Sequence, residues 1–392
     1  MKDGFRVIDG DGHMQEPMDM WENYMSAEYK DRAPKVIGHA SKILLAYGPG
    51  EIFPKGRDPR KNNDRTFVDM KERYGKALES WWSVPTRIEH MDQEGVDIAV
   101  GFPTNCQMLG SPSLTSDPGL HVALVEAYNN WAADYCKDSG GRVKTIGHAS
   151  SMDVEAGVQE IHRMANTAEI VGIFHPGMDE QASKAWGDAA VEPLWAALEE
   201  TALPVCWHGS ASHSLPTTVM GNEQGTLLRK DKYGPLGHAL GHPFGAMLAV
   251  GGIIMSGVLE KFPTMKAGFY ESNAGWLPFW LERLDDHAFG RQGVFHSDHT
   301  AKTMSLKPSE YFRRQCFIAC DGDEGSLNLV THYMDGDNIV YNTDYPHPDS
   351  PFPGAVDKFM EQPLKDEHRR KILWDNSVKC YGDKVLAGTS FE

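Results

Sequence analysis

A short stretch near the N-terminus gathers four side chains that could together bind a metal ion. Asp9, Asp11, His13 and Glu16 lie within eight residues, and glycines separate the first three of them. Residues two apart on a strand point to the same side, so Asp9, Asp11 and His13 are expected to share one face. Carboxylates and an imidazole in this arrangement are typical ligands of a divalent metal, with Glu16 following in the turn. The same residues also fit a polar turn whose aspartates cap the next helix.

These residues need a scaffold, and the rest of the chain alternates strand-like apolar runs with helical patterns. The first predicted strand is Phe5–Ile8, and eight are predicted in all, starting near residues 5, 97, 143, 170, 204, 265, 315 and 339. Strict alternation gives parallel strands joined by right-handed crossovers. Eight such units closing on themselves form an α/β fold of the (β/α)8 TIM-barrel type, and an open doubly wound sheet is the alternative. The lack of a glycine-rich nucleotide-binding motif after any strand favours the barrel.

The barrel is predicted to be a single domain covering residues 1–392, with an inserted segment at residues 18–85 after its first strand. Within the insertion, the passage Gly48–Arg65 is rich in glycine, proline and basic residues. This composition predicts a long excursion or a small lid with little regular structure.

Composition and charge narrow the class of protein. Hydrophobic residues make up 41% of the chain and charged residues 24%, which is typical of a soluble enzyme. The net charge of −17 argues against nucleic-acid binding, because phosphate recognition needs a positive surface. The apolar run Ala246–Val258 is too short to span a membrane, and the N-terminus lacks an apolar signal core. Six cysteines without a C-x-x-C pair are expected to be buried free thiols of a cytoplasmic protein.

Polar residues recur where the predicted strands end. A barrel places its catalytic groups at the C-terminal ends of its strands. The residues found there are Asp11, His13, His175, His208, Glu271, Asp321, Asp323 and Asp344. Each alone has a simpler explanation, as a histidine bonded to backbone carbonyls or an aspartate capping a helix. Because these residues occur at the ends of several strands, they predict a metal site or an acid/base cluster at the C-terminal end of the barrel, which we call its mouth.

Several motifs in this order resemble the amidohydrolase superfamily, and specifically its amidohydrolase-2 branch, which is related to aminocarboxymuconate-semialdehyde decarboxylase. They are D-x-D-x-H-x-x-E-P at residues 9–17, P-V-C-W-H-G at 204–209 and N-T-D-Y-P-H-P-D-S at 342–350. The runs Gly257–Pro263 and Tyr270–Asp285 share the resemblance, which covers nearly the whole chain. It implies a TIM barrel of the metal-dependent hydrolase type that holds one or two divalent metal ions.

The resemblance also assigns roles to individual positions. The family's strand-one H-x-H pair falls on Asp11 and His13, its strand-five ligand on His208 and its strand-eight aspartate on Asp344. That aspartate normally binds metal and moves the proton of the attacking water. The strand-six histidine is replaced by Glu271. With Glu16 and Glu271 added, the expected ligand set suits zinc or manganese, and suits two irons equally.

Further histidines surround the expected site. His347 follows Asp344 by three residues in a proline-bracketed loop, and it is expected to meet substrate or a second metal. His175 could be another ligand, although both residues could also be structural. His242 is expected to contact substrate and His238 to lie on the surface.

The leading hypothesis for function is metal-assisted hydrolysis of an amide, ester or carbon–carbon bond next to a carbonyl. A bound metal lowers the pKa of water, and Asp344 would accept its proton, with Glu271 and His242 as further catalytic residues. The first alternative is non-oxidative decarboxylation of an aromatic or enoic acid, against which the missing strand-six histidine counts. The second is a non-heme diiron monooxygenase, suggested by the extra carboxylates Glu16 and Glu271.

The substrate is expected to be a hydrophobic or aromatic small molecule. Six aromatic residues lie near the predicted mouth loops, namely Trp21, Trp81, Trp82, Trp207, Phe244 and Phe352. They could equally be core residues. The family resemblance further implies a homodimer.

Overall fold

The computed structural model describes most of the chain. The described residues are 1–17, 19–39, 42–46, 64–110, 115–175, 186–209, 234–289 and 304–392.

Eight parallel strands form one sheet, in the order in which they occur along the chain. They are β1 (Ile8–Met14), β4 (Ile98–Pro103), β5 (Val143–Gly147), β6 (Ile170–Phe174), β7 (Val205–His208), β8 (Ala267–Tyr270), β9 (Cys316–Asp321) and β10 (Ile339–Asn342). The last strand returns to the first, and just beyond β10 the Asp344 N–H donates to the Asp11 carbonyl at 3.0 Å. The sheet is therefore a nearly closed (β/α)8 barrel, as predicted, and not an open doubly wound sheet.

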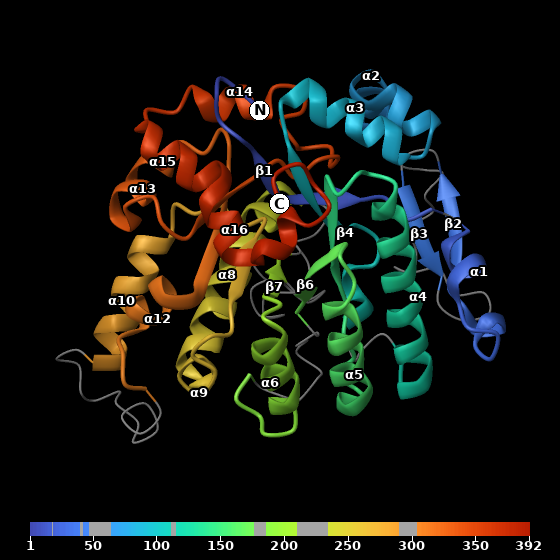
Figure 1. Cartoon of the computed structure of the whole chain (residues 1–392), viewed down its shortest axis with the longest axis horizontal. Helices are drawn as coiled ribbons and strands as arrows, with labels where there is room; N and C mark the ends of the chain where they lie inside the picture. The colour runs from blue at the N-terminus through green and yellow to red at the C-terminus, as the bar shows by residue number, and fades with distance from the viewer. Residues whose placement is uncertain are drawn as a thin grey trace.

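Helices cover the outside of the barrel (Figure 1). They are α3 (Val84–Glu94), α4 (Pro118–Lys137), α5 (Val154–Ala165), α6 (Glu192–Thr201), α8 (Gly234–Met255), α9 (Val258–Lys261), α10 (Leu277–Phe289), α12 (Pro308–Gln315), α13 (Leu327–Met334), α14 (Ala355–Met360), α15 (Asp366–Arg370) and α16 (Asn376–Tyr381). Short 3-10 or π turns lie at Gln107–Gly110, Lys371–Asp375 and Asp383–Leu386.

The ends of several helices follow from local sequence. The Asp117 carboxylate caps α4 by accepting from the backbone N–H of Gly119 and Leu120, at 3.0 and 3.2 Å. Helix α3 ends at Gly95, whose φ of +81° lies in the left-handed region that favours glycine. Helix α8 contains Pro243 in its interior and ends at Met255, before α9 begins at Val258.

The inserted segment contains regular structure on both sides of its polar passage. It includes α1 (Met20–Tyr24), a 3-10 turn at Lys30–Arg32, an antiparallel hairpin of β2 (Lys35–His39) and β3 (Lys42–Ala46), and α2 (Asp64–Glu79). Figure 1 shows α1 and the hairpin beside α4, and α2 next to α3. Most of the polar passage at 48–65 lies outside the described residues, so its role as a lid stays a prediction.

The barrel interior is packed with apolar side chains. Alternate residues of β4, Ile98, Val100 and Phe102, point inward and meet Ile8, Val171, Phe317 and Val340 from other strands. All six cysteines are buried free thiols, as expected. In a packed barrel of this kind, catalytic groups lie at the C-terminal ends of the strands. Among the described helices, none combines the length and apolarity that crossing a bilayer requires.

Candidate metal centre

The first strand differs from its prediction in position and in direction. It begins at Ile8 and runs through Met14, so the polar motif lies inside the strand and not after it. A bulge between Asp9 and Gly12 inserts one extra residue relative to β4. Because side chains alternate with a period of two, the extra residue turns Asp9 away from the face that carries Asp11 and His13. The expectation that all three share a face is therefore wrong for Asp9.

Two histidines meet at the centre of the mouth. The Nδ1 atom of His13 lies 3.1 Å from the Pro103 carbonyl, and Nδ1 of His208 lies 2.9 Å from the Gly209 carbonyl. A carbonyl only accepts, so each Nδ1 carries the proton and each Nε2 presents a lone pair. These two Nε2 atoms are 3.1 Å apart. Burial, followed by the charge of His347, lowers the pKa of His13 to about 3, which keeps its ring neutral.

Two carboxylates complete the donor set. Asp11 Oδ1 lies 3.5 Å from His208 Nε2, and Asp344 Oδ1 lies 3.1 Å from His13 Nε2. Both Asp11 oxygens are buried without a hydrogen-bond partner in the described part of the chain. A buried carboxylate facing imidazole lone pairs is strongly unfavourable unless a cation lies between them. Asp11, His13, His208 and Asp344 therefore fit a divalent metal ion.

Burial and backbone geometry set Asp344 apart. Burial raises the pKa of Asp344, but the charge of His347 and the hydrogen bonds with His13 and His347 together outweigh burial and hold that pKa well below its usual range. Nδ1 of His347 lies 2.9 Å from Asp344 Oδ1, and its ring stacks on His13 with centroids 3.9 Å apart. Asp344 has a φ of +55°, a left-handed conformation that is uncommon for a non-glycine residue. Such strain persists only where neighbouring contacts impose it, as at functional sites.

Glu271 lies beside the donor set at the end of β8. Its Oε2 is 3.2 Å from His208 Nε2, and its Oε1 is 3.5 Å from Nδ1 of His242. Burial, together with the negative charges of Asp344 and Asp11, raises the pKa of Glu271 well above its usual value. These surroundings favour the protonated form of the Glu271 carboxyl group. His242 Nδ1 also lies 3.0 Å from the Glu271 carbonyl oxygen, which fixes the ring beside the acid.

Glu16 is not part of this centre, contrary to the sequence-based prediction. Its carboxylate accepts the backbone N–H groups of Thr104, Asn105 and Cys106 at 3.0 to 3.3 Å, and the Asn105 side-chain amide at 3.1 Å. These bonds occupy the oxygens that a metal would need. Glu16 thus anchors the loop that follows β4.

We expect Glu16→Gln to lower stability without changing metal content. The new NH2 group cannot accept a backbone N–H, so the free energy of unfolding should fall by about 1–3 kcal/mol. Urea denaturation and elemental analysis would measure both quantities, with the exposed Glu89→Gln as control. Loss of bound metal in a folded Glu16→Gln protein would restore this residue to the ligand set.

His175 also lies away from the centre. Its ring packs on Trp186 at 4.2 Å and on Trp195 at 6.2 Å between centroids, in the layer outside the barrel. The preceding residue, Phe174, points into the barrel interior. Burial lowers the pKa of His175 to about 3, so its ring is a neutral core group. The side chain of His238 lies outside the described residues.

A cavity of about 200 Å³ opens next to the centre. Polar residues in its described lining that could contact a ligand include Glu271, Asp321, Asn342, Asp344 and Asp349. None of the six aromatic residues expected at the mouth is part of that wall. Trp21 instead belongs to the core, and Trp82 packs in a separate cluster with Phe352.

Sequence reasoning overlooked Asn342 and Asp349, which flank Asp344 in the N-T-D-Y-P-H-P-D motif. Their nearness in the sequence to a predicted ligand is the feature that could have identified them. Arg87 on α3 was also overlooked. Its Nη1 donates to the His13 carbonyl of β1 at 2.6 Å, and nothing in the surrounding helical sequence indicates this contact.

Comparisons with known proteins agree with this architecture. Residues 69–382, which include every barrel strand except β1, match the sequence model of a family described as Amidohydrolase. The amidohydrolase map2389c from Mycobacterium avium subsp. paratuberculosis K-10 has a TM-score of 0.71 at 19% identity, over 97% of this chain and 100% of that chain.

Two decarboxylases of known structure also share the fold. One is 5-carboxyvanillate decarboxylase from Novosphingobium aromaticivorans DSM 12444, complexed with manganese and 4-hydroxy-3-methoxy-5-nitrobenzoic acid (TM-score 0.63, 17% identity, 97% of each chain). The other is 2,6-dihydroxybenzoate decarboxylase from Rhizobium (TM-score 0.61, 16% identity, 96% of this chain and 98% of that chain). Together with the barrel and its donor set, the family match shows that this chain belongs to the amidohydrolase family, in its amidohydrolase-2 branch.

Proposed function

We propose that the protein is a metal-dependent decarboxylase of a small aromatic or enoic carboxylic acid. The observation that carries this proposal is the position of the Glu271 carboxyl group, whose pKa is raised by burial, 3.2 Å from Nε2 of His208 in the buried cluster of Asp11, His13 and His208. Decarboxylation requires a proton donor at the carbon that loses its carboxylate, and Glu271 can be that donor. The decarboxylases that share the fold support the proposal, and the divalent ion is of the kind one of them contains.

The proposed ligands are Asp11, His13, His208 and Asp344. These residues would hold a metal ion that binds and orients the anionic substrate. The cavity beside Glu271 holds the rest of the substrate. The Glu271 carboxyl group then donates its proton to the carbon as the carbon–carboxylate bond breaks. The bond's electron pair stays on that carbon, carbon dioxide leaves, and a water molecule returns a proton to Glu271.

The missing strand-six histidine counted against decarboxylation because it removes a proton donor. In this proposal Glu271 is the proton donor. A glutamic acid with a raised pKa can carry the proton that a histidine carries elsewhere. His242 holds the Glu271 backbone at 3.0 Å and so keeps the acid at the cavity wall.

Hydrolysis remains a second candidate because of the Asp344–His347 pair. A carboxylate with a lowered pKa, bonded to a histidine at 2.9 Å, has the form of a general base and its orienting partner. In that reaction Asp344 accepts the proton of an attacking water. The diiron monooxygenase was suggested by two extra carboxylates, Glu16 and Glu271. The Glu16 carboxylate accepts backbone N–H groups, so of these two only Glu271 lies beside the ligands, and we do not propose this reaction.

Turnover in isotopically labelled water separates the two reactions. The manganese-loaded protein would be offered hydroxybenzoic and enoic acids, with amides and esters of the same acids beside them. Decarboxylation predicts release of carbon dioxide and one deuterium on the product carbon in D2O. Incorporation of oxygen from H2¹⁸O into the product, without carbon dioxide, would establish hydrolysis instead. Mass spectrometry of the product reads both labels.

A further inference from the structure

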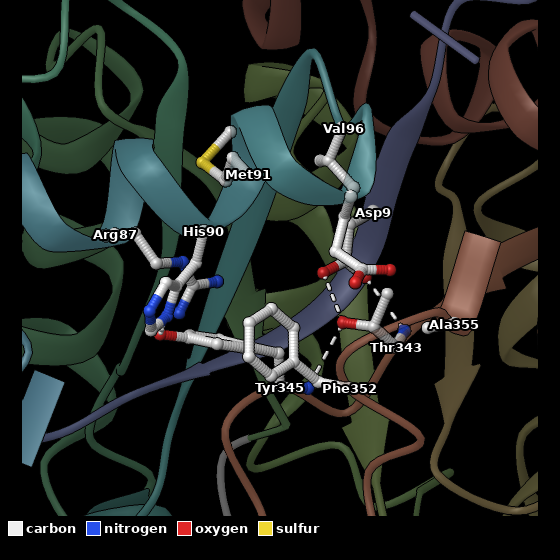
Figure 2. Close-up of a pocket in the computed structure, with 10 residues that line it drawn as sticks. Asp9, Arg87, His90, Met91, Val96, Thr343, Tyr345, Phe352 and Ala355 are labelled. Atoms are coloured by element: carbon white, nitrogen blue, oxygen red, sulfur yellow. Dashed lines mark hydrogen bonds between the residues drawn. The ribbon is translucent and has the colours of Figure 1, made fainter. Parts of the chain in front are cut away.

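The outer face of β1 carries a carboxylate that does not contact the proposed metal ligands. The bulge turns Asp9 outward, and its Oδ1 accepts the Thr343 N–H at 3.0 Å while its Oδ2 accepts the Thr343 hydroxyl at 2.6 Å. Figure 2 shows Asp9 and Thr343 facing each other, with Tyr345 on the same loop. Asp9 is almost wholly buried, at 3% exposure. A buried carboxylate is kept only where such bonds compensate its lost hydration.

Thr343 fixes the backbone on both sides of Asp344. Its hydroxyl donates to Asp9 and also accepts the Tyr345 N–H at 3.1 Å. Its carbonyl accepts the Ser350 hydroxyl at 2.8 Å. Asp344 lies between these tied residues, and its left-handed backbone is therefore imposed from both sides.

Helix α3 reinforces the same arrangement through Arg87. Its Nη1 donates to the His13 carbonyl at 2.6 Å, and its guanidinium group lies 4.5 Å from the Tyr345 ring centroid. The Tyr345 hydroxyl lies 2.7 Å from Nδ1 of His90, on the same helix. A Cβ atom at Gly12 would come within 2.7 Å of Arg87 Nη2, so a side chain there would displace the guanidinium group.

We infer that Asp9 and Thr343 are positioning residues that hold Asp344 in its ligand geometry from outside the barrel. Asp9 bonds to Thr343, and Thr343 bonds to the Tyr345 N–H, so both act on Asp344 through the neighbouring backbone, and Thr343 also lines the cavity beside Glu271. This inference rests on the metal centre of the proposed function but not on which reaction the centre performs. Residues that orient metal ligands typically contribute about 10–100-fold to metal affinity.

The test compares two substitutions of Thr343 that differ in the hydroxyl group. Thr343→Val keeps the shape but can neither donate to Asp9 nor accept from Tyr345, whereas Thr343→Ser keeps both bonds. Mn²⁺ affinity is measured from the electron paramagnetic resonance of free manganese, and unfolding from far-UV circular dichroism. We expect Thr343→Val to bind Mn²⁺ at least tenfold more weakly than wild type, and Thr343→Ser within about twofold. The spectrum of bound Mn²⁺ should also change in Thr343→Val alone.

Thr331→Val is the matched control, because Thr331 is buried on α13 and its hydroxyl has no hydrogen-bond partner in the described structure. It should bind Mn²⁺ like wild type. If Thr343→Val does not fold, Asp9→Asn tests the same link, since the amide can accept from only one of the two Thr343 donors. Wild-type affinity in folded Thr343→Val or Asp9→Asn would overturn the positioning role. Failure of wild type itself to bind any divalent ion would overturn the metal centre.

Discussion

Asp344→Asn should reduce turnover by roughly 10³-fold or more while the protein remains folded. The carboxylate is one of four proposed ligands and is the ionised group closest to His13 Nε2, at 3.1 Å. An amide presents a weaker, neutral ligand, so both metal affinity and the rate should fall. The pKa of Asp344 lies well below its usual range, so its charge stabilises the folded protein, and the melting temperature should fall while the variant still folds.

The measurement is kcat of the manganese-loaded variant beside its thermal melting curve. Asp323→Asn is the matched control, because Asp323 lines the same cavity but forms an ion pair with Lys358 at 2.9 Å, away from the ligands. Near-normal turnover in Asp344→Asn would remove this residue from both the decarboxylase and the hydrolase proposals.

Glu271→Gln should lower kcat by about 10²–10⁴-fold and leave Mn²⁺ affinity within a few fold. The amide keeps the size of the side chain but has no proton of carboxylic-acid strength to donate. Decarboxylation predicts this separation of rate from metal binding. If the reaction is hydrolysis with Asp344 as the base, the loss of rate in Glu271→Gln should be much smaller than in Asp344→Asn.

The pH profile provides an independent check on Glu271. The reaction uses the protonated form, so the rate should be high below the pKa of Glu271 and fall as the pH rises through it. Burial and nearby negative charges raise that pKa above its usual value, and a bound dication offsets part of the charge effect. Glu271→Gln should lose this descending limb. A limb that persists in the variant would have to come from another group.

The order and type of the secondary structure could be predicted because each strand and helix carries its own periodicity. The strand expected to start near residue 97 is such a local pattern, and it appears in the structure as β4, which begins at Ile98. Asp11, His13, His208, Glu271 and Asp344 could be grouped in advance because parallel strands of a barrel end at one face.

Side-chain direction could not be predicted, because it depends on contacts between distant strands. The bulge that separates Asp9 from Asp11 exists only in the pairing of β1 with β4. Glu16 has the residue type and spacing of a ligand, yet backbone N–H groups nearly ninety positions away use its oxygens. His175 ends a strand as His208 does, but it faces the helices and not the mouth.

The bonds between Asp9 and Thr343 join residues 334 positions apart, at the place where the barrel closes. During synthesis on the ribosome, a nascent chain carries Asp11 and His13 long before β10 and Asp344 emerge. Until then the first strand has a partner on one side only, and the metal site lacks the ligand from beyond the last strand. Metal capture therefore belongs to the final stage of folding, and a chain truncated before β10 would have neither a closed barrel nor a complete centre.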